Sequence, residues 1–536
     1  MLPRALSPFA SLSLLLAGLS IPALGTELFL PRFRTTTRTV VACVTALFAA
    51  FAAIRAAAFL VELRPEVQGT DFFYFLCFAR DWIDGIPVTE LSFAYFPGIY
   101  AFYRLALRVG HQDLGVVQWA YVLVLAGNAA ALGVAVGRTV RRFALGALAA
   151  VAYVAAASRL EGGFGIAEPV GTLPLAIAVA VWAGEPLRGR RGVLLALVLG
   201  AGIGLAVFVK QQCALQAAGW GPLVLATAFT PRESRHEPRA LLLVPAAAIA
   251  TFLIGVLSQG FGLMPIRVGL EAIPSYQAHA SFMENLGVVF GRVGPLALAG
   301  LISAPIVVYF TVRRAPNSEH ALNVAAFALG SAGGSLLQFI KRGYAHYGLV
   351  TVPWLVLLAA IGLALLHERA PERVRESSAA QLGWLSLAAL SFVQTDPRAR
   401  HTFALWPDPL SFRAPALGHR WREREMVGDL AQARRFVHPG EDVLVLPPRH
   451  NEVHFLLGTR SLSFAEHYAW AGMHTGNTLR ALKSKTLSAV IVLPPRGQTD
   501  DAVWRDHDCT QAVAALSGNG FRRALNVRSL SVWVRN

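Results

Sequence analysis

Acidic side chains are scarce in the first 395 residues of this chain, so their positions are informative. The aspartates of that part are Asp71, Asp81, Asp84 and Asp113, and all four lie within residues 62–114. Asp71 lies shortly after the apolar block at 39–61, where its carboxylate could accept a proton at a membrane boundary, and we predict that it is a general base. The segment is also typical of amphipathic helices on a membrane surface, with Asp81 and Asp84 on the wet face.

Two glutamates occupy a second short connection, between residues 158 and 169. Glu161 and Glu168 stand among glycines at the edge of an apolar block, and both are candidate catalytic residues. The other interpretation is a solvated turn that ends where Pro169 begins a helix.

Lysine is rare, and its placement is unusual. Only Lys210 and Lys341 lie in the apolar part, and both stand at ends of apolar blocks that carry no arginine cluster, although Arg342 follows Lys341. A lysine at such an end, away from the arginine clusters, predicts a phosphate ligand. The alternative is that both lysines extend towards lipid headgroups.

The composition indicates which elements must position these groups. The 536 residues are 55% hydrophobic and 15% charged, with a mean hydropathy of +0.50, whereas soluble domains carry about 25% charged residues. This excludes a soluble enzyme of several domains. A membrane span needs about 20 apolar residues, and about 11 blocks approach that length. They are residues 39–61, 115–137, 143–158, 169–184, 193–209, 212–230, 240–259, 286–310, 321–340, 347–366 and 379–395.

Arginine clusters predict the orientation of these spans. They occur at every second boundary, for example at residues 138–142, 188–191 and 232–239, which is the positive-inside pattern. The loop at 62–114 and everything after residue 395 are then extracytoplasmic. The net charge of +16 therefore reflects membrane orientation, and no basic stripe with interleaved aromatics indicates a nucleic-acid partner.

Three parts of the chain follow from this pattern. Residues 1–38 have an uncertain status, because their apolar run resembles a signal peptide although Arg32, Arg34 and Arg38 fit a cytoplasmic side. Residues 39–395 form a mostly α-helical polytopic bundle. Residues 396–536 are expected to form a small α/β domain outside the membrane. Its apolar runs at 442–448 and 488–495 end in Pro-Pro and predict strands, with helices near 421–437, 477–485 and 501–517 and a closing hairpin at 524–534.

Cysteine and histidine spacings predict no metal site. The four cysteines are far apart in sequence, which favours free or buried thiols. His450 and His454 stand four residues apart, but the glutamate between them does not follow the first histidine directly, so the spacing is not that of a zinc protease.

Four short motifs in order resemble a known family. They are Gly69-Thr-Asp71-Phe-Phe-Tyr74, Gly85-Ile-Pro87, Tyr95-Phe-Pro97 and Arg342-Gly-Tyr-Ala-His346-Tyr347. Together they resemble the outer loops of the C-type membrane glycosyltransferases, which include protein O-mannosyltransferases and lipid A aminoarabinose transferases. The family commonly has Tyr-Pro-Pro where this chain has Tyr-Phe-Pro.

The resemblance implies an inverting transferase of the cell inner membrane, whose donor is a sugar on a polyprenyl phosphate. Asp71 would be the base, and the acceptor would be a glycan, a lipid or a protein. The substrate-binding candidates are Tyr95, Lys210, Lys341, Arg342, His346 and Tyr347. Some family members use a divalent metal, but this sequence assigns no ligands to one.

Three other functions remain open at this point. A ligase or polymerase of lipid-linked glycans would share the donor chemistry. A transporter of lipids or polysaccharides would need charges within its spans, and Arg55 is the only basic residue deep in an apolar block. A scaffold with an outer binding domain would leave the lysine positions unexplained.

Overall fold

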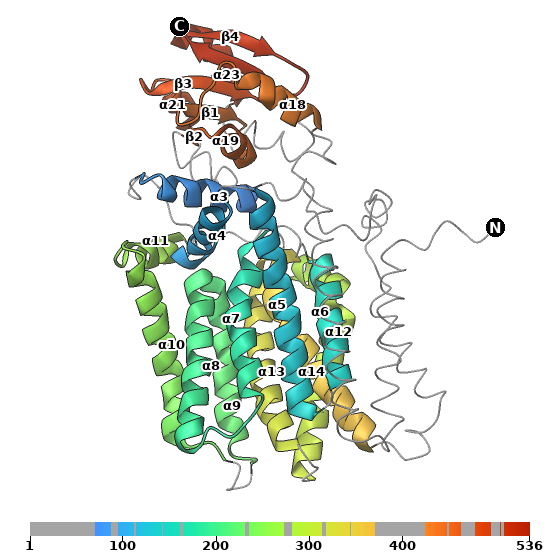
Figure 1. Cartoon of the computed structure of the whole chain (residues 1–536). Helices are drawn as coiled ribbons and strands as arrows, with labels where there is room; N and C mark the ends of the chain where they lie inside the picture. The colour runs from blue at the N-terminus through green and yellow to red at the C-terminus, as the bar shows by residue number, and fades with distance from the viewer. Residues whose placement is uncertain are drawn as a thin grey trace, which may run out of the picture.

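Figure 1 shows the computed structural model of the chain. The structure describes residues 70–86, 95–111, 114–141, 143–160, 165–230, 235–272, 281–313, 318–342, 345–369, 424–447, 450–461, 477–494, 504 and 509–536. The segment 1–38, the spans expected at 39–61 and 379–395, and Glu161 lie outside these residues.

A bundle of long helices forms the main body (Figure 1). Its helices are α5 (Leu114–Val140), α6 (Phe143–Arg159), α7 (Ala167–Trp182), α8 (Gly189–Val209), α10 (Pro238–Ser258), α12 (Phe282–Val312), α13 (Ser318–Arg342) and α14 (Gly348–Arg369). Within the described residues, five are long and apolar enough to cross a membrane, and two further apolar helices are shorter. The predicted class, a mostly α-helical multi-pass membrane protein, is therefore confirmed.

One predicted span has a different form from the others. The block at 212–230 is a 3-10 helix, η3 (Gln211–Gly219), followed by the short α-helix α9 (Trp220–Ala226). A 3-10 helix rises about 2.0 Å per residue, so these elements extend as far as a longer α-helix would. Gln212 and Gln216 are buried in η3, and Gln216 Nε2 donates to Thr172 Oγ1 of α7 at 3.2 Å.

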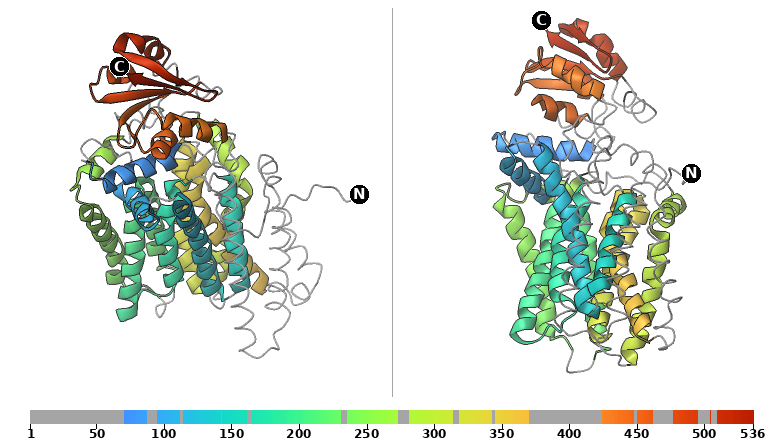
Figure 2. Two further views of the ribbon diagram at one scale, coloured as in Figure 1. Left: turned by 45° about the horizontal axis from the view of Figure 1, so that its top comes forward. Right: turned by 45° about the vertical axis from the view of Figure 1, so that its right-hand side comes forward.

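Two short helices lie across one end of the bundle, as the loop at 62–114 predicts (Figure 2). They are α3 (Thr70–Ile83) and α4 (Pro97–Val109), and α11 (Met264–Ala272) lies at the same end. The expected wet face of α3 is only partly correct. Asp84 is exposed, but Asp81 is 5% exposed, because α3 is covered on two sides rather than one.

A five-stranded sheet lies beyond α3, at the same end of the molecule (Figures 1 and 2). The strand order is β2-β1-β3-β5-β4. The strands are β1 (Asp442–Leu446), β2 (Arg460–Ser461), β3 (Leu487–Val492), β4 (Phe521–Asn526) and β5 (Ser531–Arg535). The helices of this C-terminal α/β region are α18 (Arg424–Ala433), α19 (Asn451–Leu457), α21 (Asn477–Ala481), α23 (Cys509–Ala515) and the 3-10 turn η7 (Ser517–Asn519).

The sheet pairing follows from the sequence pattern. Strands β1 and β3 occupy the two apolar runs that end in Pro-Pro, and they pair in parallel, while β4 and β5 form the antiparallel hairpin expected near the C-terminus. Side chains of β1 and β3 point alternately to two separate apolar clusters. Val443 and Val445 belong to one, Leu444 and Leu446 to the other, so both faces of the sheet are covered.

Candidate functional site

Asp71 lies in the first turn of α3, at the end of the bundle that faces the sheet. Tyr95 donates its hydroxyl to Asp71 Oδ2 at 3.1 Å. Burial raises the pKa of the Asp71 carboxyl, although His346, Lys210 and the Tyr95 hydrogen bond oppose the rise. A carboxylate with a raised pKa holds a proton more strongly than an ordinary aspartate, which suits a general base.

A buried ion pair lies close to Asp71. Glu168, in the first turn of α7, pairs through Oε1 with the ammonium of Lys210, the residue that ends α8. Their side chains are 0% and 1% exposed, and Glu168 Oε2 has no hydrogen-bond partner among the described residues. The ammonium also faces the rings of Tyr95 and Tyr347, at 4.9 and 5.3 Å from their centroids.

The predicted late loop contributes two residues to the same place. His346 and Tyr347 lie in the 3-10 turn η5 (Ala345–Tyr347) that precedes α14. The His346 Nε2 atom is 3.9 Å from Glu168 Oε1, and the His346 and Tyr347 rings meet edge to face at 4.6 Å. The imidazole therefore faces the same carboxylate that Lys210 contacts.

Two glycines allow these elements to approach one another. A Cβ at Gly165 would lie 2.2 Å from a Phe72 ring carbon, and Gly165 has a φ of +67°, a region that favours glycine. Its carbonyl accepts a hydrogen bond from Tyr103 at 2.5 Å. A Cβ at Gly98 would lie 2.7 Å from the Phe208 carbonyl oxygen. Close packing thus sets α3 and α4 against the start of α7, where Glu168 lies. It also sets α4 against the end of α8, where Lys210 lies.

The structure brings six of the predicted site residues together. They are Asp71, Tyr95, Glu168, Lys210, His346 and Tyr347. The Lys341 side chain is exposed at the end of α13, and its backbone carbonyl accepts from Asn285 Nδ2 at 3.3 Å. Glu161 and the side chain of Arg342 lie outside the part of the chain that is described.

Sequence reasoning missed Arg80, whose side chain reaches the C-terminal α/β region. Arg80 is 6% exposed, and its guanidinium donates to the carbonyls of His454 and Thr459. The one available signal was a basic residue in the loop at 62–114, on the side where arginine clusters are not expected. That signal does not distinguish Arg80 from Arg104 or Arg108.

Among the residues that the structure describes, no three His, Cys, Asp or Glu side chains gather closely enough to hold a divalent metal. Glu168 already neutralises the buried Lys210 ammonium, and a metal placed at this carboxylate would be repelled by that ammonium.

The arrangement combines two chemical abilities. Asp71 can take a proton from a hydroxyl that is brought to α3. Glu168 holds the Lys210 ammonium in one place, and a cationic donor that is positioned before the reaction can stabilise an anion that forms during it. A proton acceptor beside a preorganised cation is what group transfer with an anionic leaving group requires.

Comparisons with known proteins bear on the fold. No family model and no curated protein matches the sequence. The structure is similar to ArnT from Cupriavidus metallidurans, solved bound to undecaprenyl phosphate, with a TM-score of 0.57 at 14% identity over 93% of this chain and 98% of that one. It is also similar to the archaeal oligosaccharyltransferase AglB from Archaeoglobus fulgidus, solved with an inhibitory peptide and a dolichol-phosphate. There the TM-score is 0.51 at 12% identity, over 90% of this chain and 72% of that one.

These similarities cover nearly the whole chain. They show that this chain shares the fold of ArnT and AglB, and at such low identity they concern the fold alone. The chemistry must be argued from the site.

Proposed function

We propose that this protein transfers a sugar from a polyprenyl-phosphate donor to an acceptor hydroxyl, with inversion at the anomeric carbon. The observation that carries the proposal is the gathering of Asp71, Glu168, Lys210 and His346 at one end of a bundle with the fold of ArnT. ArnT and AglB were both solved with a polyprenyl phosphate, which supports the same class of donor here.

Asp71 is the proposed base. Its carboxylate takes the proton from the acceptor hydroxyl while that oxygen forms a bond to the anomeric carbon. The bond from the anomeric carbon to the phosphate oxygen breaks on the opposite side, and its electron pair leaves with the lipid phosphate. A lipid phosphate is a good leaving group, so this step needs one base and cations but no general acid.

Lys210 is the proposed cation for the departing phosphate. Its ammonium is buried between Glu168 and the rings of Tyr95 and Tyr347, so it is held in one place before the donor arrives. Lys341 and Arg342 are proposed as further phosphate contacts. They end α13 just before η5, which carries His346.

The proposed side of the membrane is the extracytoplasmic one, in the inner membrane. Arg188 and Arg191 stand at the start of α8, and Lys210 at its other end. The positive-inside pattern therefore supports a cytoplasmic position for the two arginines and an outer position for the site.

A second candidate is transfer of a preassembled glycan, as a ligase or polymerase of lipid-linked glycans. The similarity to AglB, an oligosaccharyltransferase, favours it. Donors that carry one sugar or several would separate the two candidates, because only the second function requires the longer donor.

The test is transfer of radiolabelled sugar by the purified protein, using a panel of polyprenyl-phosphate-linked hexoses and pentoses. Asp71→Asn should lower the rate by about 10²–10⁴-fold, because asparagine keeps the shape but cannot take a proton. Binding of undecaprenyl phosphate should be unchanged. Asp84→Asn is the matched control, since Asp84 is an exposed aspartate in the turn that directly follows α3, and it should transfer at the parental rate.

Two results would count against the proposal. Near-parental transfer by Asp71→Asn would show that Asp71 is not the base. A parent protein that transfers sugar from none of these donors, although it binds undecaprenyl phosphate, would instead favour a lipid transporter.

A further inference from the structure

Helix α3 has two opposite buried faces. Successive residues of an α-helix are separated by about 100° around its axis, so Phe73, Cys77 and Arg80 form one stripe. Asp71 and Phe75 lie on the opposite side. Each stripe has its own set of contacts, which explains why residues 72–81 are buried all round the helix.

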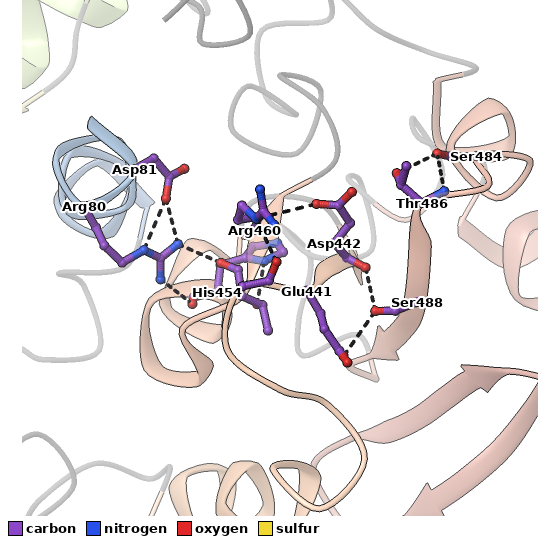
Figure 3. A network of polar contacts seen from close by, with 11 residues as sticks. Arg80, Asp81, Glu441, Asp442, His454, Arg460, Ser484, Thr486 and Ser488 are labelled. Atoms are coloured by element: carbon purple, nitrogen blue, oxygen red, sulfur yellow. Dashed lines mark hydrogen bonds and ion pairs between the residues drawn. The ribbon is translucent and has the colours of Figure 1, made fainter. Parts of the chain in front are cut away.

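The Arg80 stripe contacts helix α19 of the C-terminal α/β region (Figure 3). Arg80 Nη1 donates to the His454 carbonyl at 2.9 Å, and Nη2 donates to the Thr459 carbonyl at 2.7 Å. These carbonyls belong to the last turn of α19 and the residue before β2. Asp81 Oδ1 accepts from Arg80 Nε and Nη2 at 3.2 and 3.1 Å and balances the buried charge.

Two further contacts lie along the same stripe. The Cys77 thiol donates to the Asn451 carbonyl at 3.4 Å, and the Phe73 and Phe455 rings lie 5.8 Å apart. The stripe thus meets α19 from its first residue, Asn451, to its end. The contact therefore extends along the whole length of α19.

The connection continues into the sheet. Residue Arg460 of β2 follows Thr459, and its backbone amide donates to the Glu441 carbonyl at 2.9 Å. Arg460 Nε donates to the Gly440 carbonyl at 2.8 Å, and β2 pairs with β1. The Arg80 guanidinium is therefore anchored to an edge of the sheet.

The opposite face of α3 packs on the site. Phe75 meets the Tyr95 ring at 5.2 Å, and Tyr95 is the residue that donates to Asp71. Phe78 stacks on Tyr100 of α4 at 3.9 Å. A change at the Arg80 stripe that shifts or rotates α3 must therefore move Asp71 relative to Tyr95.

We propose that the C-terminal α/β region is a working part of the site and that Arg80 is its positioning residue: by fastening α3 to α19, it fixes where the Asp71 carboxylate stands. This inference rests on the proposed function. Arg80 touches no reacting atom. It acts through α3, and its loss would leave the Thr459 carbonyl and the Asp81 carboxylate without the guanidinium. The His454 carbonyl would keep the hydrogen bond from the Thr459 amide.

The experiment compares three single variants with the parent in the sugar-transfer assay. Arg80→Ala removes the guanidinium, Arg80→Lys keeps its charge and one possible hydrogen bond, and Phe455→Ala weakens the same contact from the other side with a smaller risk to folding. Arg108→Ala is the control, because Arg108 is an exposed arginine of neighbouring α4. Hydrogen exchange of residues 70–83 reports the fastening of α3 without any need for activity.

We expect Arg80→Ala to lower kcat by roughly 10²-fold while KM for the lipid donor stays the same, because a displacement of about 1 Å costs that much. Arg80→Lys should recover part of the loss, and Phe455→Ala should fall between the lysine variant and the parent. Exchange of α3 should quicken in the same order.

The acid limb of the pH–rate profile should move to lower pH in Arg80→Ala, because water then reaches the Asp71 carboxylate that Tyr95, Lys210, Glu168 and His346 surround. A variant that is only less stable would keep the parental profile.

Three outcomes decide the matter. Faster α3 exchange with parental kcat would overturn the inference, because the fastening would then not matter for transfer. Unchanged exchange in Arg80→Ala and Phe455→Ala would overturn it as well. A parent protein without transferase activity would instead overturn the proposed function, and this inference with it.

Discussion

Helices α7 and α8 are joined at both of their ends by a glutamate and a cation, and the two junctions differ sharply. At the site, Glu168 and Lys210 pair with side-chain exposures of 0% and 1%. At the opposite end, Glu185 pairs with Arg191 at 2.6 Å with exposures of 20% and 73%, and it also pairs with Arg138. The same pairing is thus made once in a closed, aromatic-lined position and once at the surface.

The difference shows that charge pairing alone does not account for the Glu168–Lys210 junction. The exposed junction joins the two helices without placing a charge in the interior. Burying a pair costs desolvation that the attraction between the charges often fails to offset. A buried pair beside Asp71 is therefore better explained by a role in the site than by a role in joining the helices.

The largest expected difference between the two junctions appears when the cation of each is removed. Lys210→Met should lower transfer by about 10²–10³-fold, because a preorganised charge for the phosphate is lost. It should also lower the free energy of unfolding by on the order of 3–5 kcal/mol, since the buried Glu168 carboxylate loses the ammonium that pairs with it. Arg191→Met should change that free energy by about 0–1 kcal/mol, because Arg138 still pairs with Glu185.

Transfer assays and denaturation in detergent would measure both effects. The comparison would fail if the two substitutions changed stability equally, or if Lys210→Met transferred sugar as fast as Arg191→Met.

A smaller effect separates stability from chemistry at the buried junction. Replacing both partners, Lys210→Met with Glu168→Gln, should recover most of the stability that Lys210→Met loses, because no lone charge remains inside. Transfer should stay low, since the cation is still missing. Thermal unfolding and the transfer rate would be measured on the same preparations. Recovery of transfer together with stability would mean that Lys210 acts only as the partner of Glu168.

The smallest effect concerns pH. Burial raises the pKa of Asp71, so its carboxylate is protonated at a higher pH than that of an ordinary aspartate. Transfer should therefore fall on the acid side and rise as pH rises through that pKa. Tyr95→Phe removes a hydrogen bond that stabilises the carboxylate and lowers its pKa, so it should move the acid limb to higher pH.

The control for this profile is Glu185→Gln at the exposed junction, which should leave the acid limb where it is. A limb that moves to lower pH in Tyr95→Phe would contradict the assignment of the limb to Asp71.

Local patterns explain which features could be predicted from the sequence. The Pro-Pro ends of two apolar runs predict β1 and β3, and the position of Asp71 beside an apolar block places it at the boundary. Lys210 could be singled out because a cation stood on an unexpected side. These inferences use only residues that are close together in the chain.

Some features could not be predicted because they depend on contacts between residues far apart in the sequence. Others were missed because a surface helix was assumed to have one solvated face. Asp81 was expected in water, since an amphipathic helix on a surface has one solvated side, but α19 covers the second side of α3. Arg80 meets carbonyls 374 and 379 residues further along the chain, a separation that no periodicity reports. The 3-10 form of η3 was also missed, because apolar composition does not distinguish a 3-10 helix from an α-helix.

Among the described strands, β4 lies at one edge of the sheet and carries positive charge. Strand β4 is the last strand of the described sheet, and it carries Arg522 and Arg523 as exposed residues. Proteins held in one membrane share an orientation, so the β4 edges of neighbouring copies would meet at the same height. Charged side chains on an edge strand oppose joining of sheets between molecules. The two arginines thus favour separate molecules even where the chains are crowded in the membrane plane.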